Sequence, residues 1–302
     1  MSTAIPYANL NAKGENWPAV QGCGGVDEDG GTLKCKPICW MREGNHRWGR
    51  SSEPSFHPEH LADPLHWREP RRILMNFTGD TFDPAISDEQ IAAMFGIVAA
   101  CPQHTFLCLT KQAKRMREWF AWMKRAEDVA FRLICAVRNL RLGVEVDDRL
   151  RSAPGWPLPN LWTGVSVMEP DDLGRVEHLV HCPAAVRFVS AEPLLGPVDL
   201  TRWMTRCGEC GNHGSVAYEH VEPGSSLCLD ACPRRGEGPD VDWVVTAPDS
   251  SGRMPHDLDW FRALRDQCVA AGVPFMFKDQ RGFPELDGRV WDEMPPSLPV
   301  AP

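Results

Sequence analysis

The 302-residue sequence lacks a long hydrophobic run and a signal-like start. Its longest apolar stretch, IAAMFGIVAAC at residues 91–101, is shorter than the roughly 18 residues that a membrane-spanning helix needs. The opening MSTAIPYANL has no basic region followed by an apolar one, so no signal peptide is predicted. We therefore expect a cytoplasmic protein with reduced thiols, in which the 12 cysteines serve metal sites or core packing.

The sequence also lacks an excess of positive charge. A net charge of −9 argues against a protein that coats nucleic acid through its overall electrostatics. The best local basic segment is KQAKRMREWFAWMKR at residues 111–125. A solvated helix face is the alternative interpretation of that segment, with its methionines and aromatic residues in the core.

Tyrosine is scarce, with two residues beside 12 tryptophans. We expect several tryptophans, such as Trp40, Trp162 and Trp243, to pack in the core or in the barrel. Because Trp40 directly follows a cysteine, it can also pack against whatever that cysteine holds.

Six short runs rich in β-branched or aromatic residues predict buried strands. They lie at residues 72–77, 104–110, 160–167, 185–191, 242–247 and 273–278. Helical patterns separate them. Ser87 with Gln90 three residues later predicts a capping box. A later helix is predicted to end at Gly272, with one apolar face formed by Leu258, Phe261, Leu264 and Cys268.

The alternation of strands and helices predicts an α/β fold with a parallel sheet, specifically a partial (β/α) barrel. A seventh or eighth strand is expected within the first 60 residues or within 126–158. The predicted organisation is a barrel with an N-terminal cysteine loop at 1–200, a cysteine-rich insert at 201–239, and barrel completion with a C-terminal tail at 240–302.

The insert carries four cysteines with a spacing close to that of a zinc ribbon. Two residues separate the first pair, 17 separate the pairs, and three separate the last pair: Cys207, Cys210, Cys228 and Cys232. Four thiolates can complete a tetrahedral zinc site, and metal binding would supply folding energy to a segment poor in core residues. The alternatives are an iron–sulfur centre on the same thiolates, replacement of one ligand by His213 or His220, and unliganded cysteines.

The stretch GCGGVDEDGGTLKCKPICWMRE at residues 22–43 holds three cysteines, Cys23, Cys35 and Cys39. Three thiolates around a 4Fe-4S cluster leave one iron without a protein ligand, which can bind a substrate or cofactor. A three-cysteine zinc site with His46 or Asp27 as fourth ligand is one alternative, and a loop without metal is another.

Motifs along nearly the whole chain carry a resemblance to a known group. They are NWPAVQGC at 16–23, PLHWREPRRILMNFTGDTFD at 64–83, CPQHTFLCLTKQ at 101–112, LPNLWTGVSVME at 158–169, PAAVRFVSAEPLLGPVDL at 183–200, DWVVTAPDSSG at 242–252, LRDQCVAAGVPFMFKDQRG at 264–282 and DGRVWDEMP at 287–295. With these motifs the chain resembles an uncharacterised family of phage and prophage three-cysteine proteins. That family is of radical S-adenosylmethionine (radical-SAM) type and is distantly similar to spore photoproduct lyase.

The resemblance implies an enzyme that uses a 4Fe-4S cluster and S-adenosylmethionine to generate a 5′-deoxyadenosyl radical. It implies DNA or a modified nucleotide as substrate and a reductant such as flavodoxin or ferredoxin as partner. Several features depart from the family pattern, among them the gap of 11 residues between Cys23 and Cys35, which is longer than usual, and FKDQ at 277–280, where the family has FKQW. The last two cysteines are separated by three residues, where two are usual, and TAPDSSG stands where the family has a glycine-rich run.

Polar residues follow the predicted strands, where barrel enzymes gather their chemistry. The resemblance implies cofactor binding at the ends of two strands, by Thr78, Gly79, Asp80, Ser166 and Glu169. The candidate catalytic residues are Glu192, Lys111 and Lys278. Two alternatives remain open: Asp80 as a turn residue, and Glu192 as the ion-pair partner of one of the two lysines.

A competing function belongs to another class: a zinc-stabilised nucleic-acid-binding or interaction protein that keeps the barrel without the chemistry. The altered cysteine spacing and the TAPDSSG run are the features that favour it. A metal-free barrel is the third possibility.

Overall fold

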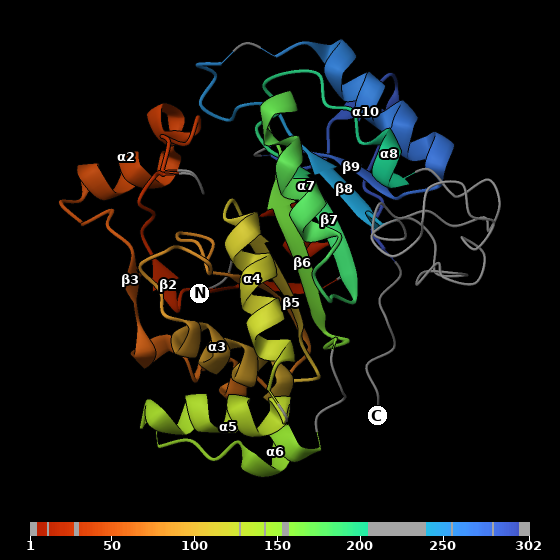
Figure 1. Ribbon diagram of the computed structural model, residues 1–302. Coiled ribbons are helices and arrows are strands. Elements are labelled where there is room, and N and C mark those ends of the chain that lie inside the picture. The colour runs from red at the N-terminus through yellow and green to blue at the C-terminus, as the bar shows by residue number, and fades with distance from the viewer. Residues whose placement is uncertain are drawn as a thin grey trace. The chain divides into compact units, whose positions relative to one another are not determined.

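The computed structural model describes residues 5–10, 12–26, 30–126, 128–141, 143–152, 157–204, 240–254, 256–279 and 281–295. Its main feature is a parallel seven-stranded sheet in the order β1-β4-β5-β6-β7-β8-β9 (Figure 1). The strands are β1 (Lys13–Trp17), β4 (Arg71–Met75), β5 (Thr105–Thr110), β6 (Leu161–Ser166), β7 (Val186–Ala191), β8 (Trp243–Thr246) and β9 (Phe275–Phe277). This mixed α/β arrangement is consistent with a partial β/α barrel.

Two short antiparallel pairs accompany the large sheet: β2 (Val20–Gln21) with β3 (Ser55–Phe56), and β10 (Glu285–Leu286) with β11 (Arg289–Val290). The α-helices are α1 (Pro6–Asn9), α2 (Trp40–Arg47), α3 (Asp88–Ala100), α4 (Ala113–Lys124), α5 (Val129–Asn139), α6 (Asp147–Arg151), α7 (Gly174–Leu179), α8 (Thr201–Met204) and α10 (Leu258–Ala271). Short 3-10 helices are η1 (Lys36–Ile38), η2 (Pro58–His60), η3 (Asp63–His66) and η4 (Pro170–Leu173).

All six predicted strands are present, each within two residues of its expected limits. The expected seventh strand is β1, in the first 60 residues, whereas residues 126–158 contribute the helices α5 and α6 instead. The capping box is confirmed, because the Ser87 hydroxyl accepts from the Gln90 N–H at 3.2 Å and the Gln90 side chain accepts from the Ser87 N–H at 2.9 Å.

The chain divides into two compact units. The first contains residues 1–163 together with two short later pieces, 183–185 and 297–302. Its core is rich in aromatic residues: the rings of Phe82, Phe95, Trp119 and Phe120 contact one another. Met116, Trp119, Phe120 and Met123 of α4 lie in this core, as the sequence predicts, whereas Trp122 is only half-buried. Figure 1 shows α3, α5 and α6 grouped at one end of this unit.

The second unit contains residues 164–182 and 186–296. Trp243 is fully buried on β8, as expected. Helix α10 buries Phe261, Leu264 and Cys268 and ends at Gly272, whose φ of 68° is the left-handed conformation that glycine adopts without strain. The prediction for Leu258 is wrong, because this first residue of the helix is 46% exposed and lies outside the buried face.

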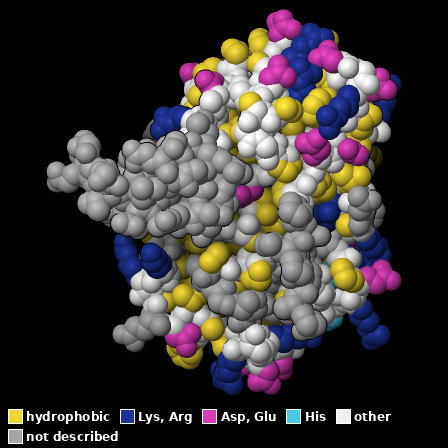
Figure 2. Space-filling model, turned by 90° about the vertical axis from the view of Figure 1, so that its right-hand side faces the viewer, with side chains coloured by type: hydrophobic (Ala, Val, Ile, Leu, Met, Phe, Trp, Pro, Cys, Tyr) yellow, Lys and Arg dark blue, Asp and Glu magenta, His cyan; other side chains and the backbone are white. Residues whose placement is uncertain are grey.

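The described surface mixes charges of both signs. On the face shown in Figure 2, acidic and basic side chains are interspersed. Within the described residues, none of the helices has the length and apolar character needed to cross a membrane. The predictions for Cys207, Cys210, Cys228 and Cys232, together with His213, His220 and Asp27, lie outside the described residues.

Candidate functional site

The segment that leads into Cys23 is bonded to the residues that follow β4. The Val20 N–H donates to the Asn76 side-chain oxygen at 2.7 Å, and the Gly22 N–H donates to the Thr78 carbonyl at 2.9 Å. A side chain at Gly79 would meet backbone, since an added Cβ would lie 2.8 Å from the Val20 carbonyl oxygen. The two segments therefore approach as closely as they do only because residue 79 is glycine.

The backbone of Cys23 is fixed on both sides. Its N–H donates to the Ser52 carbonyl at 2.9 Å, and its carbonyl accepts from Nη1 of Arg42 at 3.0 Å. The Cys23 sulfur accepts from the Gly25 N–H at 3.3 Å. These contacts hold the first cysteine between the end of β4 and helix α2.

The loop after Cys23 is held by two buried polar side chains, one following β4 and one following β5. Asp83 accepts from the Gly24 N–H at 3.3 Å, and the Gln112 amide donates to the Val26 carbonyl at 2.8 Å. The loop therefore lies at the carboxyl ends of β4 and β5, the edge where parallel α/β folds place their ligands.

The other two cysteines flank the 3-10 helix η1, with Cys35 before it and Cys39 directly before α2. All three thiols are half-buried and form no disulfide. Nevertheless, among the described residues no three His, Cys, Asp or Glu side chains lie together as a metal-binding group. The structure thus provides three thiols on one anchored loop, but it does not place them close enough together to bind one metal ion.

Trp40, which follows Cys39, stacks on Phe77 with the ring centroids 5.3 Å apart. Trp40 is 52% exposed, so its predicted place in the core is wrong, whereas Trp162 is buried as expected. Because Phe77 lies two residues after β4, this contact ties the start of α2 to the same sheet edge that anchors Cys23.

Burial raises the pKa of the Cys23 thiol to about 11. The Gly25 N–H and the charge of Lys111 act in the opposite direction, whereas the nearby carboxylates of Asp80 and Asp83 add to the rise. The thiol is therefore protonated at neutral pH, and a metal that binds it must displace the proton.

Asp80 is buried and uses both carboxylate oxygens. Oδ1 accepts from the Thr110 hydroxyl at 2.6 Å and from the Phe82 N–H at 2.9 Å, and Oδ2 accepts from the Lys111 N–H at 2.9 Å. Burial raises the pKa of Asp80, and these three hydrogen bonds act against that rise. The Asp80 side chain thus joins the ends of β4 and β5, which is the turn role left open by the sequence.

The remaining candidates of the first unit lie on the same edge. The Thr78 carbonyl already accepts from Gly22, and Gly79 forms an isolated parallel bridge with Gly22. Lys111 follows β5 and lies close enough to Cys23 and Asp80 to affect the pKa of both. The structure therefore brings Thr78, Gly79, Asp80 and Lys111 to the cysteine loop.

In the second unit, Glu192 and Lys278 form a largely buried ion pair. Nζ of Lys278 lies 2.8 Å from Oε2 of Glu192, and this is the pairing that the sequence left open for Glu192. The other carboxylate oxygen, Oε1, is buried without a hydrogen-bond partner among the described residues. A buried, unsatisfied carboxylate oxygen can accept a hydrogen bond from a ligand.

Ser166 is the last residue of β6, and Glu169 follows this strand in the same unit. Ser166 is buried, and its carbonyl accepts from Nη1 of Arg175 at 2.9 Å. Arg175 also pairs with Asp172 at 2.9 Å. Glu169 directly precedes η4. This local network fixes the turn after β6 that carries both candidates.

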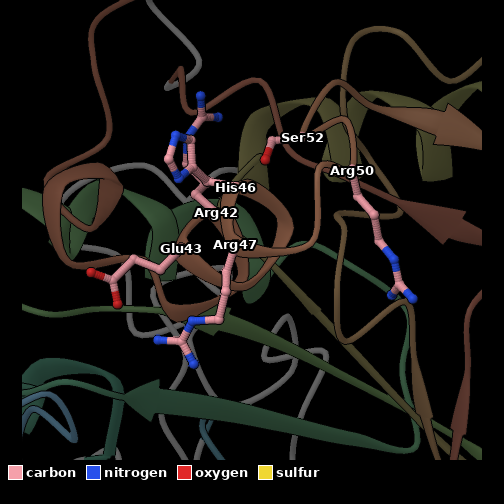
Figure 3. Close-up of a pocket in the computed structure, with 6 residues that line it drawn as sticks. All are labelled: Arg42, Glu43, His46, Arg47, Arg50 and Ser52. Carbon is pink, nitrogen blue, oxygen red and sulfur yellow. The ribbon is translucent and has the colours of Figure 1, made fainter.

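A hollow that the sequence does not predict lies beside the cysteine loop. It has a volume of about 670 Å³ and is lined by Arg42, Glu43, His46, Arg47, Arg50 and Ser52. Figure 3 shows the first four of these on α2, with Arg50 and Ser52 on the segment that follows it. We call it the α2 hollow. The only signal in the sequence is the density of basic residues in MREGNHRWGR at 41–50.

Comparison with known protein families gives one match. Residues 8–295 match the model of a family described as "Protein of unknown function (DUF5131)". Neither the curated proteins nor the solved structures contain a match to the chain.

Proposed function

The chain belongs to the DUF5131 family, whose description assigns no activity, and we propose from its own residues that it is a radical S-adenosylmethionine enzyme. The observation that carries this proposal is the anchoring of a three-cysteine loop at the carboxyl ends of β4 and β5. A cofactor held by this loop would lie at the edge where parallel β/α folds place their ligands.

The donor set fits the proposed cluster in its chemistry. Cys23, Cys35 and Cys39 are free thiols on one short segment, and three thiolates leave one iron of a 4Fe-4S cluster open. The thiols are not gathered in the structure, so cluster assembly must draw Cys35 and Cys39 toward the fixed Cys23. When bound, such a cluster supplies the electron that cleaves S-adenosylmethionine to a 5′-deoxyadenosyl radical.

The residues around the loop have defined tasks in this proposal. Lys111 places positive charge near Cys23, which favours the thiolate and acts against the burial that raises its pKa, and Arg42 holds the Cys23 carbonyl. Gly79 lets the loop approach the end of β4. Asp80 and Thr110 hold the two strand ends together and so keep the loop anchors in register.

In the second unit, Glu192 is the candidate that offers a free acceptor. Its buried Oε1 can accept from an amino or hydroxyl group of a ligand, while Lys278 fixes the other oxygen. Ser166 and Glu169 stay candidates for the ribose or carboxylate of S-adenosylmethionine. The substrate proposed is a nucleic acid or a modified nucleotide, with flavodoxin or ferredoxin as reductant.

The test is chemical analysis of protein purified without oxygen. We expect iron and inorganic sulfide in equal amounts, a brown colour, and cleavage of S-adenosylmethionine on chemical reduction. Single Cys23→Ala, Cys35→Ala and Cys39→Ala variants should each lose most of the iron and all of the cleavage activity.

The matched control is Cys135→Ala, which removes a half-buried cysteine of α5 that lies outside the loop. This variant should keep its iron, sulfide and cleavage activity. Wild-type protein that contains no inorganic sulfide after anaerobic reconstitution would remove the radical chemistry from the proposal.

One observation favours a second candidate, a zinc-stabilised nucleic-acid-binding or interaction protein without catalytic activity. The three thiols are not gathered in the described structure, which suits a loop that does not hold a cluster. For this candidate, the anaerobic protein would be colourless and would contain zinc without sulfide.

A further inference from the structure

The α2 hollow concentrates positive charge on an acidic protein. Its lining contains three arginines and His46 against a single carboxylate, Glu43, although the chain as a whole carries a charge of −9. Its volume of about 670 Å³ falls within the range of about 300–1,000 Å³ that is usual for ligand sites. The hollow therefore suits an anionic ligand larger than a single ion.

Within the part of the chain that the structure describes, the arginines of the hollow form no ion pair. Among the described residues, no carboxylate forms an ion pair with Arg42, Arg47 or Arg50, although many other arginines of the chain are paired. Arg42 uses Nη1 for the Cys23 carbonyl and keeps its other N–H groups. Guanidinium groups bind phosphate through paired N–H donors, so these arginines are suited to phosphate oxygens.

The wall of the hollow is held in shape by Asn45. Its side-chain amide donates to the Ser51 carbonyl at 3.0 Å and to the Ser52 hydroxyl at 3.3 Å. Its backbone carbonyl accepts from the Arg50 N–H at 2.8 Å. The segment after α2 is thereby folded back onto the helix. Because the Ser52 hydroxyl accepts from Asn45, its own hydrogen remains available for a ligand.

An exposed aromatic residue adjoins these cations. Trp48 directly follows α2, stands between Arg47 and Arg50 in sequence, and is 72% exposed. Proteins that bind single-stranded nucleic acid combine basic groups for the phosphates with aromatic side chains on which bases stack. An inorganic phosphate would need the cations only.

We propose that the α2 hollow, together with Trp48, binds a single-stranded nucleic acid. Arg47 and Arg50 contact its phosphodiester groups, and Trp48 stacks on a base. Arg42 and Ser52 are each hydrogen-bonded to the backbone of Cys23, so the bound strand lies directly beside the cysteine loop. Its use as the substrate of radical chemistry rests on the function proposed above, whereas the binding itself does not.

The test is fluorescence anisotropy with a labelled oligothymidine and protein purified in air, which needs no cluster. We expect Trp48→Ala to weaken binding by about fivefold or more, which corresponds to the loss of one base stack. The double variant Arg47→Gln/Arg50→Gln removes two phosphate contacts. Between about 50 and 200 mM salt, wild-type affinity should therefore fall about sevenfold more than that of the double variant, at a slope of about 0.7 per contact.

The matched control is Lys124→Gln/Arg125→Gln, which removes the same charge from the exposed end of the other basic segment, at the end of α4. This control should retain the affinity and the salt slope of the wild type. An equal loss in the control and in the Arg47→Gln/Arg50→Gln variant would overturn the proposal, since general electrostatics would then explain the binding.

Competition distinguishes the ligand sources. Inorganic phosphate or thymidine monophosphate that displaces the oligonucleotide as well as unlabelled strand does, at equal phosphate concentration, would overturn the assignment to a nucleic-acid strand. Circular dichroism should show that all variants fold as the wild type does. Failure of binding leaves the iron and sulfide analysis unaffected, so the two proposals fail separately.

Discussion

At the scale of single residues, Asp80 shows how a buried charge holds the site together. Its two oxygens receive three donors, from Phe82, Thr110 and the Lys111 backbone. In Asp80→Asn, the new NH₂ group must face at least one of those donors, which leaves a buried N–H or O–H unsatisfied. We expect the free energy of unfolding to fall by about 2 kcal/mol, measured by urea denaturation.

The free energy of unfolding that is lost in Asp80→Asn should depend on pH. Burial raises the pKa of Asp80 in the folded state. The free energy of unfolding of the wild type should therefore fall as the pH rises from the ordinary carboxyl pKa to the raised pKa of the folded state. Asp80→Asn does not titrate, so the stability gap between wild type and variant should narrow as the pH rises through this window. A gap that widens would contradict the raised pKa. Asp148→Asn, the same change at an exposed position, should stay within about 0.5 kcal/mol of the wild type.

The sequence identifies the polar residues that follow the strands. It is less successful at predicting which other residues they contact. Polar residues after a strand identify Asp80, Lys111, Glu192 and Lys278 as candidates. The ion pair of Glu192 with Lys278 joins residues that are 86 positions apart in the sequence. A single sequence does not show which distant residues are close in the folded protein. The raised pKa of Cys23 likewise depends on tertiary burial.

At the scale of elements, the six strands β4 to β9 are predictable because each is a local apolar run. Strand β1 is not, because KGENW is mostly polar. It forms by pairing with β4, and its buried Glu15 is neutralised by Arg71 of that strand at 2.5 Å. A buried ion pair between neighbouring strands gives no hydrophobic signal, so only tertiary context assigns this strand.

The contact between the cysteine loop and the end of β4 can be tested at Gly79. In Gly79→Ala, the new Cβ would lie 2.8 Å from the Val20 carbonyl and 3.0 Å from that of Gly22, so the two segments must separate. We expect a loss of about 2 kcal/mol in the free energy of unfolding, together with reduced iron and sulfide in the anaerobic protein. Urea denaturation and elemental analysis measure the two effects.

Gly174→Ala is the matched control for this change. Gly174 begins α7 with a helical φ of −55° and has no atom within 4 Å of an added Cβ. Alanine there should be neutral or slightly stabilising. Equal effects of the two substitutions would show that the close approach at Gly79 does not hold the loop.

At the scale of the whole molecule, the net charge does not predict the basic α2 hollow, which is the feature most relevant to ligand binding. A chain with a charge of −9 predicts weak general affinity for nucleic acid, and the face in Figure 2 carries mixed charges. Basic side chains line the α2 hollow because α2 carries Arg42, His46 and Arg47 and because Asn45 folds the segment with Arg50 back onto the helix. Composition averages over such local structure, so the hollow could be found only in three dimensions.

The two cysteine sets should give two independent pools of metal. Each set lies within one short stretch of the chain, so each pool depends on its own ligands, and metal binding should fold each stretch separately. The sequence spacing predicts zinc on the insert, whose cysteines lie outside the described residues, and the proposed function places iron on the loop. We expect Cys35→Ala to lose iron and keep zinc, and Cys207→Ala/Cys210→Ala to lose zinc and keep iron. Elemental analysis of anaerobic protein measures both metals in one sample. If either variant loses both metals while it stays folded, the two sets depend on each other, and the division into an iron loop and a zinc insert is wrong.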